Sequence, residues 1–287
     1  MIRPVRHVEV AEIMGTAVSV HVVGGARDPA HEAAITACFD ELRRVDRVFS
    51  TYREDSDIRR IARGELSMAD ADPWVDEVAQ ACAHAEADTK GLFSAGWAGG
   101  FDPTGYVKGW AVERVARSHL APLLGEHGVI AVGINAGGDM QLRTATDADW
   151  VWNVAIADPW DRSRVLATVP VRDGAVATSG AAERGAHIVD PRSGSAAGDV
   201  VSATVVAASL ARADVWATAA VVAGLDDLSW ISRAGDTTGL VVGARGDVRR
   251  WIDGVEVGVE TAPPSHGVRR IFSIALPRAS SSTSLSR

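Results

Sequence analysis

The sequence predicts a mixed α+β fold, in which largely antiparallel sheets pack against helices. Segments with a helical apolar period and segments with a strand period are interspersed along the 287 residues. They do not follow the strict strand–helix alternation that predicts a doubly wound parallel sheet. No glycine fingerprint of a dinucleotide-binding or phosphate-binding loop accompanies them.

The first half of the chain is predicted to carry most of the helices. Residues 8–23 are predicted to form a strand that is interrupted at Met-Gly-Thr. A polar loop or short helix start covers 51–61, and a glycine-rich connection precedes the third long helix. Helices are predicted from apolar residues at helical spacing over about 29–49, 74–88 and 107–120.

The second half is predicted to be rich in strands, with period-two alternation clearest at 150–157. One further helix is expected near 209–223. A late hairpin is expected at 239–254, in which Arg249, Arg250 and Trp251 belong to the hairpin and not to a site. No repeat or linker divides the chain, so we expect one domain over 1–277 and a disordered Ser-rich tail at 278–287. The other strands are predicted at 128–135, 164–180 and 200–208.

Composition excludes several classes of protein. A formal charge of −8 and a pI near 5.5 disfavour a general binder of nucleic acid or of anionic membranes. Cys38 and Cys82 are too few for a disulfide scaffold or a cysteine-built metal site, and their apolar surroundings predict buried thiols. No apolar run approaches the roughly 18 residues of a membrane span, and the N-terminus resembles no secretion signal. We therefore expect a soluble, cytoplasmic protein.

Two glycine-containing segments could bind a ligand. Residues 101–110 are predicted to be a turn that enters a helix, where free backbone N–H groups favour anions. There Asp102 is an N-cap candidate, and Lys108 is either a ligand contact or a solvated side chain. Residues 134–140 end a strand with Asn-Ala-Gly-Gly-Asp, which suits either a tight hairpin turn or a close approach of backbone to a ligand.

Two further segments hold hydroxyl and carboxyl groups. Ser179, His187 and Asp190 lie close together in sequence, but the absence of a Gly-x-Ser-x-Gly elbow argues against a serine hydrolase. Asp214 and Thr218 lie one helical turn apart and point the same way. Their oxygens suit Mg²⁺, although a solvated helix face is an alternative explanation for this pair alone.

These four segments, in this order and after the 51–56 loop, resemble the ApbE family of FAD:protein FMN transferases. The resemblance extends from about Met14 to Gly224. The matching pieces are MGT at 14–16, STYREDSDI at 50–58, DPTGYVKGW at 102–110, INAGGD at 134–139, WNVAIADP at 152–159, TSG at 178–180, HIVDPRSG at 187–194 and ADVWAT at 213–218.

The resemblance implies a two-lobed α+β unit that binds FAD and holds Mg²⁺ at its pyrophosphate. It also implies transfer of the FMN half of FAD onto a threonine or serine hydroxyl of an acceptor protein, with release of AMP. Asp214, Thr218 and the backbone carbonyl at Gly105 would hold the metal. His187 would accept the proton of the acceptor hydroxyl, or else merely orient the phosphate or a strand. The implied FAD contacts are Met14, Tyr52, Leu92, Phe93, Ser94, Asp102, Lys108 and Val189.

Departures from the family pattern keep two other functions open. Ser94 stands where many members have aspartate, and Ala217 stands where some have an acidic residue before the metal-binding threonine. Loss of one carboxylate predicts weaker Mg²⁺ binding. The alternatives are an FAD pyrophosphatase that yields FMN and AMP, and a non-catalytic FAD-binding protein. The best-known members are exported, whereas this sequence more nearly resembles cytoplasmic ones.

Overall fold

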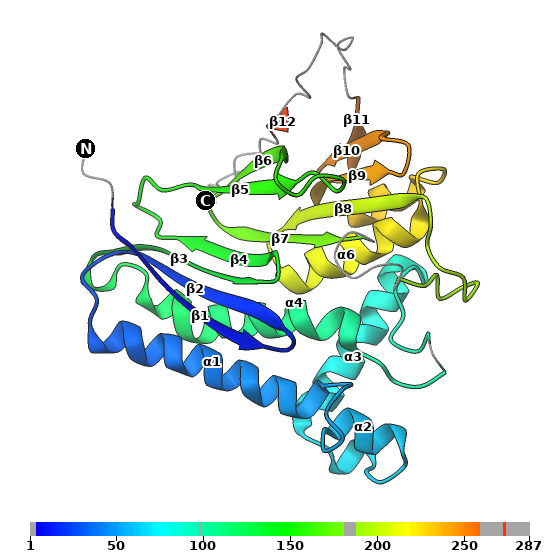
Figure 1. Ribbon diagram of the computed structural model, residues 1–287, viewed down its shortest axis with the longest axis horizontal. Coiled ribbons are helices and arrows are strands. Elements are labelled where there is room, and N and C mark those ends of the chain that lie inside the picture. The colour runs from blue at the N-terminus through cyan, green and yellow to red at the C-terminus, as the bar shows by residue number, and fades with distance from the viewer. Residues whose placement is uncertain (1–3, 98, 181–187, 259–271, 274–287) are drawn as a thin grey trace, which may run out of the picture.

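The computed structural model describes residues 4–97, 99–180, 188–258 and 272–273. Its centre is an antiparallel nine-stranded sheet, in which the strands follow the order β1-β2-β3-β4-β7-β8-β9-β10-β11. A three-stranded sheet in the order β12-β6-β5 lies on one face of it, and the long helices lie on the other (Figure 1). The expected α+β class with largely antiparallel sheets is confirmed.

The elements have the following bounds. The long helices are α1 (Pro29–Phe49), α3 (Pro73–Thr89), α4 (Thr104–Val115) and α6 (Leu210–Ala223), and the short one is α2 (Asp57–Ala62). The large sheet contains β1 (Arg6–Ile13), β2 (Thr16–Gly24), β3 (Val129–Ala136), β4 (Asp139–Thr144), β7 (Gly174–Ser179), β8 (Val200–Ala207), β9 (Thr238–Gly243), β10 (Val248–Ile252) and β11 (Val255–Val257). The small sheet contains β5 (Trp152–Ala157), β6 (Val165–Val171) and β12 (Phe272–Ser273).

Four expectations about elements need correction. Residues 164–180 are not one strand, because they form β6 and β7, which belong to different sheets. Residues 8–23 are not one strand, because Met14 and Gly15 take positive φ values of 54° and 68° and close a tight turn between β1 and β2. Strand β4 was not predicted, since its short, mixed sequence lacks clean alternation. The third long helix begins at Thr104, three residues earlier than expected, and passes at Ala116 into a π-helical turn.

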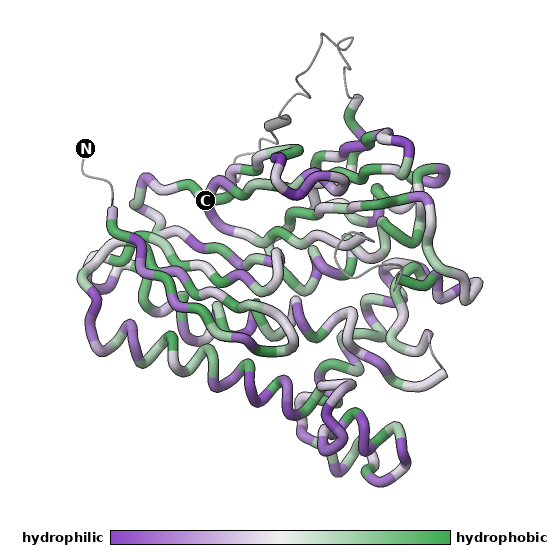
Figure 2. Tube along the Cα trace, in the orientation of Figure 1, coloured by the Kyte–Doolittle hydropathy of each residue, from purple (hydrophilic) through white to green (hydrophobic). Residues whose placement is uncertain are grey.

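Two apolar layers enclose the large sheet. Side chains of β2, β3, β7 and β8 that face the helices pack against α1, α4 and α6. Side chains on the opposite face, such as Val176, Val206 and Leu240, pack against Val154 and Val169 of the small sheet. The strand period of two sends alternate residues into these two layers, and Figure 2 shows apolar segments along both. Among the helices that the structure describes, none combines the length and apolar character needed to cross a membrane.

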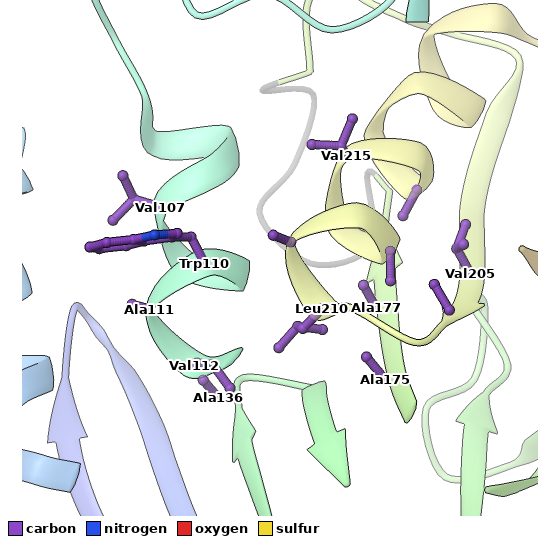
Figure 3. Close-up of a cluster of buried hydrophobic side chains, with 14 of the residues drawn as sticks. Val107, Trp110, Ala111, Val112, Ala136, Ala175, Ala177, Val205, Leu210 and Val215 are labelled. Carbon is purple, nitrogen blue, oxygen red and sulfur yellow. The ribbon is translucent and has the colours of Figure 1, made fainter. Parts of the chain in front are cut away.

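Helix α6 lies centrally and is apolar on nearly every side. Eleven of its residues are buried, and Ser209 begins it by accepting a hydrogen bond from the Arg212 amide. A helix that is apolar all round is stable only when it is enclosed. Its neighbours are α4, β7 and β8, and Figure 3 shows these three elements around it. A carboxylate on this helix, Asp214, is therefore held in the interior.

The tail at 278–287, with its predicted disorder, lies outside the described residues.

Cys38 and Cys82 are buried as free thiols, as expected. Burial raises the pKa of each thiol to about 12, so neither is a reactive thiolate near neutral pH. In the late hairpin, Trp251 is fully buried and donates a hydrogen bond to Thr237 Oγ1 over 2.9 Å, which gives it a structural role.

Candidate metal and nucleotide site

The site begins where α4 crosses α6. At Gly109 of α4, an added Cβ would lie 3.0 Å from the Leu210 carbonyl oxygen and 3.1 Å from Asp214 Cβ. Only a residue without a side chain allows the two helices this approach. Figure 3 shows the two helices side by side here, with Trp110 and Ala111 of α4 pointing away from α6. Because of this contact, the preceding residue of α4, Lys108, lies beside Asp214.

Lys108 lies between two buried carboxylates. Its Nζ forms a close ion pair with Asp139 Oδ2 and lies 3.9 Å from Asp214 Oδ2. The side chains of Asp139 and Asp214 are 2% and 5% exposed, against 26% for Lys108. Buried charges are costly unless they are paired, so this arrangement of one cation and two anions is a built polar centre and not a solvated helix face.

Asp139 also connects the sheet to this centre. It is the first residue of β4 and follows the Gly137–Gly138 turn, in which both glycines have positive φ and Asn135 Oδ1 accepts from the Gly138 amide. The expected hairpin turn is thus present. Asp139 Oδ1 accepts a hydrogen bond of 3.0 Å from the Thr178 backbone N–H. The end of β7 is therefore tied to the same carboxylate that pairs with Lys108.

The hydroxyl groups of the site face one another across β7 and α6. Ser179 Oγ and Thr218 Oγ1 are 3.2 Å apart, and Thr218 follows Asp214 by one helical turn. A buried carboxylate and two hydroxyls are hard oxygen donors of the kind that Mg²⁺ prefers. In the parts of the chain that the structure describes, no group of three or more His, Cys, Asp or Glu side chains could hold a metal ion. Any metal here would thus need hydroxyl, carbonyl, water or substrate oxygens as well.

The loop before α4 and the first turn of that helix contain the predicted site residues Asp102 and Gly105. Asp102 does not occupy the N-cap position, which falls to Pro103. Its carboxylate nevertheless accepts hydrogen bonds from the Thr104 amide and hydroxyl, at 3.1 and 2.7 Å. Gly105 lies in the first turn of α4, where an added Cβ would be 3.2 Å from Phe93 Cε2. The residue type at 105 is thus constrained by packing.

Packing and hydrogen bonds within the protein fix the position of residues 92–94. The side chains of Leu92 and Phe93 are buried in the core, each 4% exposed, and the Phe93 amide donates to Thr89 Oγ1. Ser94 Oγ donates to Glu86 Oε2 over 3.0 Å and accepts from the Gly96 amide. A nucleotide contact of these three residues stays a prediction.

Three predicted residues, Met14, Tyr52 and Val189, are not joined to the Lys108 centre by any described contact. Met14 lies in the β1–β2 turn, Tyr52 is 93% exposed, and Val189 forms an isolated bridge with Ala196. None of these three has a hydrogen bond or ion pair to Lys108, Asp139 or Asp214 in the described contacts. His187, the predicted base, lies outside the described residues.

Sequence reasoning did not assign Asp139 or Ser179 to the site. Both lie in the motifs INAGGD and TSG, which were recognised as part of the family pattern. The sequence signal for Asp139 is its place after two glycines, and the signal for Ser179 is its place before Gly180. Gly180 has the same kind of constraint as Gly109, because a Cβ there would come within 2.2 Å of the Val201 carbonyl oxygen.

A cavity of about 190 Å³ lies on the face of the large sheet that is opposite the helices. Ser179 and Gly180 form part of its wall, and Ala155 and Ala157 of β5 form another part. It lies between the small sheet and the ends of β4, β7 and β8, on the side of β7 that carries Thr178. Lys108, Asp139, Asp214 and Thr218 are not among the residues that line this cavity, so it lies across the sheet from the polar centre.

Comparison with known proteins agrees with this architecture. The model of the ApbE family matches residues 14–99 and 96–241. The chain is 28% identical over 151 residues to the FAD:protein FMN transferase of Escherichia coli K12, covering 49% of this chain and 43% of that protein. It is 32% identical over 122 residues to the Salmonella typhimurium FAD:protein FMN transferase, covering 39% and 35%. The match thus spans less than half the length of these curated relatives.

Solved structures show the same fold. The ApbE protein of Thermotoga maritima superposes with a TM-score of 0.74 at 22% identity, covering 86% of this chain and 97% of that one. The apo form of the Pseudomonas stutzeri flavinyl transferase ApbE gives a TM-score of 0.68 at 22% identity, covering 87% and 96%. Because the family model covers most of the sequence and the fold agrees, the chain belongs to the ApbE family.

Proposed function

We propose that this protein transfers the FMN half of FAD onto a threonine or serine hydroxyl of an acceptor protein, in a Mg²⁺-dependent reaction that releases AMP. The observation that carries this proposal is the pairing of Lys108 with the buried carboxylates of Asp139 and Asp214, one helical turn before Thr218, which faces Ser179. The names of the curated relatives support the same reaction class.

The donor set fits a hard divalent cation at the pyrophosphate. Asp214 and Thr218 would hold it from α6, and the carbonyl at Gly105 would add an oxygen from α4. When bound, Mg²⁺ neutralises the charge on the phosphate oxygens, which otherwise repels an oxygen nucleophile. Lys108 places a fixed positive charge next to these ligands. The low exposure of both carboxylates limits water, which strengthens each of these interactions.

Transfer also needs a group that accepts the proton of the acceptor hydroxyl. His187 is our candidate, because an imidazole changes its charge close to physiological pH. We expect His187→Ala to lose transfer while it retains FAD binding. Measurement of FAD affinity by fluorescence titration, beside transfer, separates these effects. Unchanged transfer in this variant would assign the histidine a structural role.

Two other functions are alternatives to flavin transfer. Water in place of the acceptor hydroxyl would make the protein an FAD pyrophosphatase, and a very weak metal site would leave an FAD-binding protein. The side chain of Ala217 is completely buried next to Thr218, so no second carboxylate is available from that position. This observation favours weaker metal binding than in members that carry an acid there.

The deciding experiment mixes purified protein with FAD, Mg²⁺ and a candidate acceptor protein, with an acceptor lacking the target hydroxyl as the matched control. Released AMP and the flavin fluorescence that stays on the denatured acceptor are measured. We expect fluorescence only with metal and with the intact acceptor. AMP release without labelling, equal in both acceptors, would instead establish the pyrophosphatase. Bound FAD with neither product would establish a flavin-binding protein for the acceptors tested.

A further inference from the structure

The cavity beside the small sheet follows the edge of a strand. Its wall includes four consecutive residues of β5, from Val154 to Ala157. Side chains of a strand alternate between the two faces of its sheet, and in β5 they are buried and exposed in turn. A cavity that contacts both kinds in unbroken succession therefore borders the edge of the strand and not one of its faces.

This edge of β5 is open in the part of the chain that the structure describes. There β5 pairs with β6 alone and forms one end of the small sheet (Figure 1). Pro170 of β6 lies opposite Asn153 and has no N–H to donate, which suits the non-hydrogen-bonded position of an antiparallel ladder. By alternation, Asn153 and Ala155 direct their backbone N–H and C=O groups away from β6, toward the open edge.

The β5 edge lacks the features that usually prevent strand pairing. Charged side chains and proline are common on edge strands, because they discourage the addition of another strand. The edge strand β1 of the large sheet, for example, contains one arginine and two glutamates. β5 contains no charged residue, and its exposed side chains are those of Asn153, Ala155 and Ala157. These small, uncharged side chains leave the edge accessible to another extended segment.

The opposite wall of the cavity is formed by strand ends with small residues. It contains Gly137 and Gly138 before β4, and Thr178, Ser179 and Gly180 at the end of β7. The volume of about 190 Å³ is below the roughly 300 Å³ at which pockets for small organic ligands begin. The cavity is thus too small for a whole flavin nucleotide, whereas a short extended segment with small side chains can lie along β5.

Ser179 connects this cavity to the polar centre. It lines the cavity, and its hydroxyl oxygen lies 3.2 Å from that of Thr218, the proposed metal ligand on α6. The cavity and the polar centre lie on opposite faces of the large sheet, and the end of β7 is common to both. Flavin transfer to a protein requires that a segment of the acceptor be held where its hydroxyl can reach the site, and the cavity offers such a place.

We propose that an extended segment of the acceptor protein adds to the open edge of β5 as a further strand of the small sheet, and that its threonine or serine reaches the polar centre around the end of β7. This inference rests on the proposed transfer of flavin to a protein. In this mode of recognition, main-chain hydrogen bonds supply the affinity and the surrounding pockets select the side chains. The acceptor is thus recognised by its backbone at Ala155 and by the small size of its residues.

The first test adds the blocked peptide acetyl-Gly-Ala-Thr-Ala-Gly-amide to the protein in the presence of FAD and Mg²⁺. Amide hydrogen exchange in β5 is followed by NMR. We expect the amides of Asn153 and Ala155 to exchange at least about 10-fold more slowly at saturating peptide, because each gains a hydrogen-bond acceptor. The matched control is the same peptide with its backbone amides N-methylated, which keeps the side chains and cannot pair as a strand. It should leave the exchange rates unchanged.

The second test changes the same edge on the enzyme. Ala155→Pro replaces the N–H of an exposed edge position by a ring that blocks an added strand, and edge positions tolerate proline. We expect the KM for the candidate acceptor protein to rise about 10-fold or more, as for the loss of a backbone hydrogen bond. FAD affinity and kcat should stay within a few-fold of the wild type. Ala155→Ser is the matched control, because it keeps the N–H and a small side chain.

Several outcomes would overturn the inference. These are unchanged exchange with the peptide, equal protection by the N-methylated peptide, and an unchanged KM in an Ala155→Pro variant that thermal unfolding shows to be folded. If that variant does not fold, the N-methylated peptide still decides. Protection of Asn153 and Ala155 by FAD alone would assign the cavity to the flavin, and protection that grows with protein concentration would assign the edge to a second copy of the chain. All of these results leave flavin transfer intact, whereas peptide-dependent protection without labelling of any acceptor would contradict the proposed function alone.

Discussion

The Asp214 carboxylate lies on a helix that is otherwise apolar and buried. A carboxylate in such surroundings costs free energy unless a cation or hydrogen bonds compensate for it. Here the ammonium of Lys108 is 3.9 Å away, and helix crossing at Gly109 brings the two side chains together. At the scale of single residues, the site therefore depends on the pairing of the buried Asp214 carboxylate with the Lys108 ammonium.

We expect Asp214→Asn to lower metal-dependent turnover by about 100-fold or more, as for other groups that stabilise developing charge. The fold should remain, because Asp139 still pairs with Lys108. Turnover at several Mg²⁺ concentrations, together with thermal unfolding, checks this. Asp40→Asn, a change of a 65% exposed carboxylate on α1, is the control. Normal Mg²⁺-dependent turnover in Asp214→Asn would refute the metal site.

At the scale of elements, the crossing of α4 and α6 determines the geometry of the site. Alanine favours a helix over glycine by about 1 kcal/mol. At Gly109, however, the added Cβ would meet the backbone of α6 at 3.0 and 3.1 Å, and backbone atoms cannot rotate away. Overpacking of this kind costs about 1–3 kcal/mol. The free-energy cost of pushing the helices apart should therefore exceed the gain in helix propensity.

Gly109→Ala is therefore expected to lower the free energy of unfolding and to weaken Mg²⁺-dependent turnover, because it moves Lys108 away from Asp214. Urea unfolding and turnover at saturating FAD measure the two effects. Gly198→Ala is the control, since no atom lies within 4 Å of its added Cβ and its φ is not positive. If Gly109→Ala were as stable and active as the wild type, the close crossing would not matter to the site.

At the scale of the whole molecule, the small sheet packs on the face of the large sheet that is opposite the helices. His21 of β2 lies at this junction. It interacts with Ser19 Oγ over 2.9 Å, with Arg6 over 3.0 Å and with the Trp152 ring. Burial, and secondarily the charge of Arg6, lower the pKa of His21 to about 4. The junction thus contains an imidazole that stays neutral in the folded protein.

Because the pKa of His21 is lowered on folding, we expect the free energy of unfolding to fall at acidic pH. Between pH 6.5 and about 4 the unfolded chain binds a proton at His21 and the folded chain does not, so stability falls as the pH falls. The loss for this group is at most about 3 kcal/mol. In His21→Gln, the free energy of unfolding from urea titrations at pH 7 and pH 5 should differ less than in the wild type. An equal pH difference in both proteins would contradict the role of His21.

Much of the fold could be predicted from local sequence. The apolar stripes predicted α1, α3 and α6 nearly at their observed bounds, because helical periodicity is a property of neighbouring residues. Strand β4 and the turn at Met14–Gly15 were missed, since a short mixed strand and a left-handed turn leave weak periodic signals. Of the site, the sequence indicated Asp214, Thr218 and Lys108 through motifs but said nothing about their contacts.

By itself, the sequence determined the α+β class, the order of the motifs and thus membership of the ApbE family. Only the tertiary structure decided that Asp139 belongs with Lys108 and Asp214, and that Ser179 faces Thr218. These residues come from β4, β7, α4 and α6, and their distances depend on sheet register and on the crossing at Gly109. Local periodicity contains no information about such contacts, because they arise only when distant elements pack.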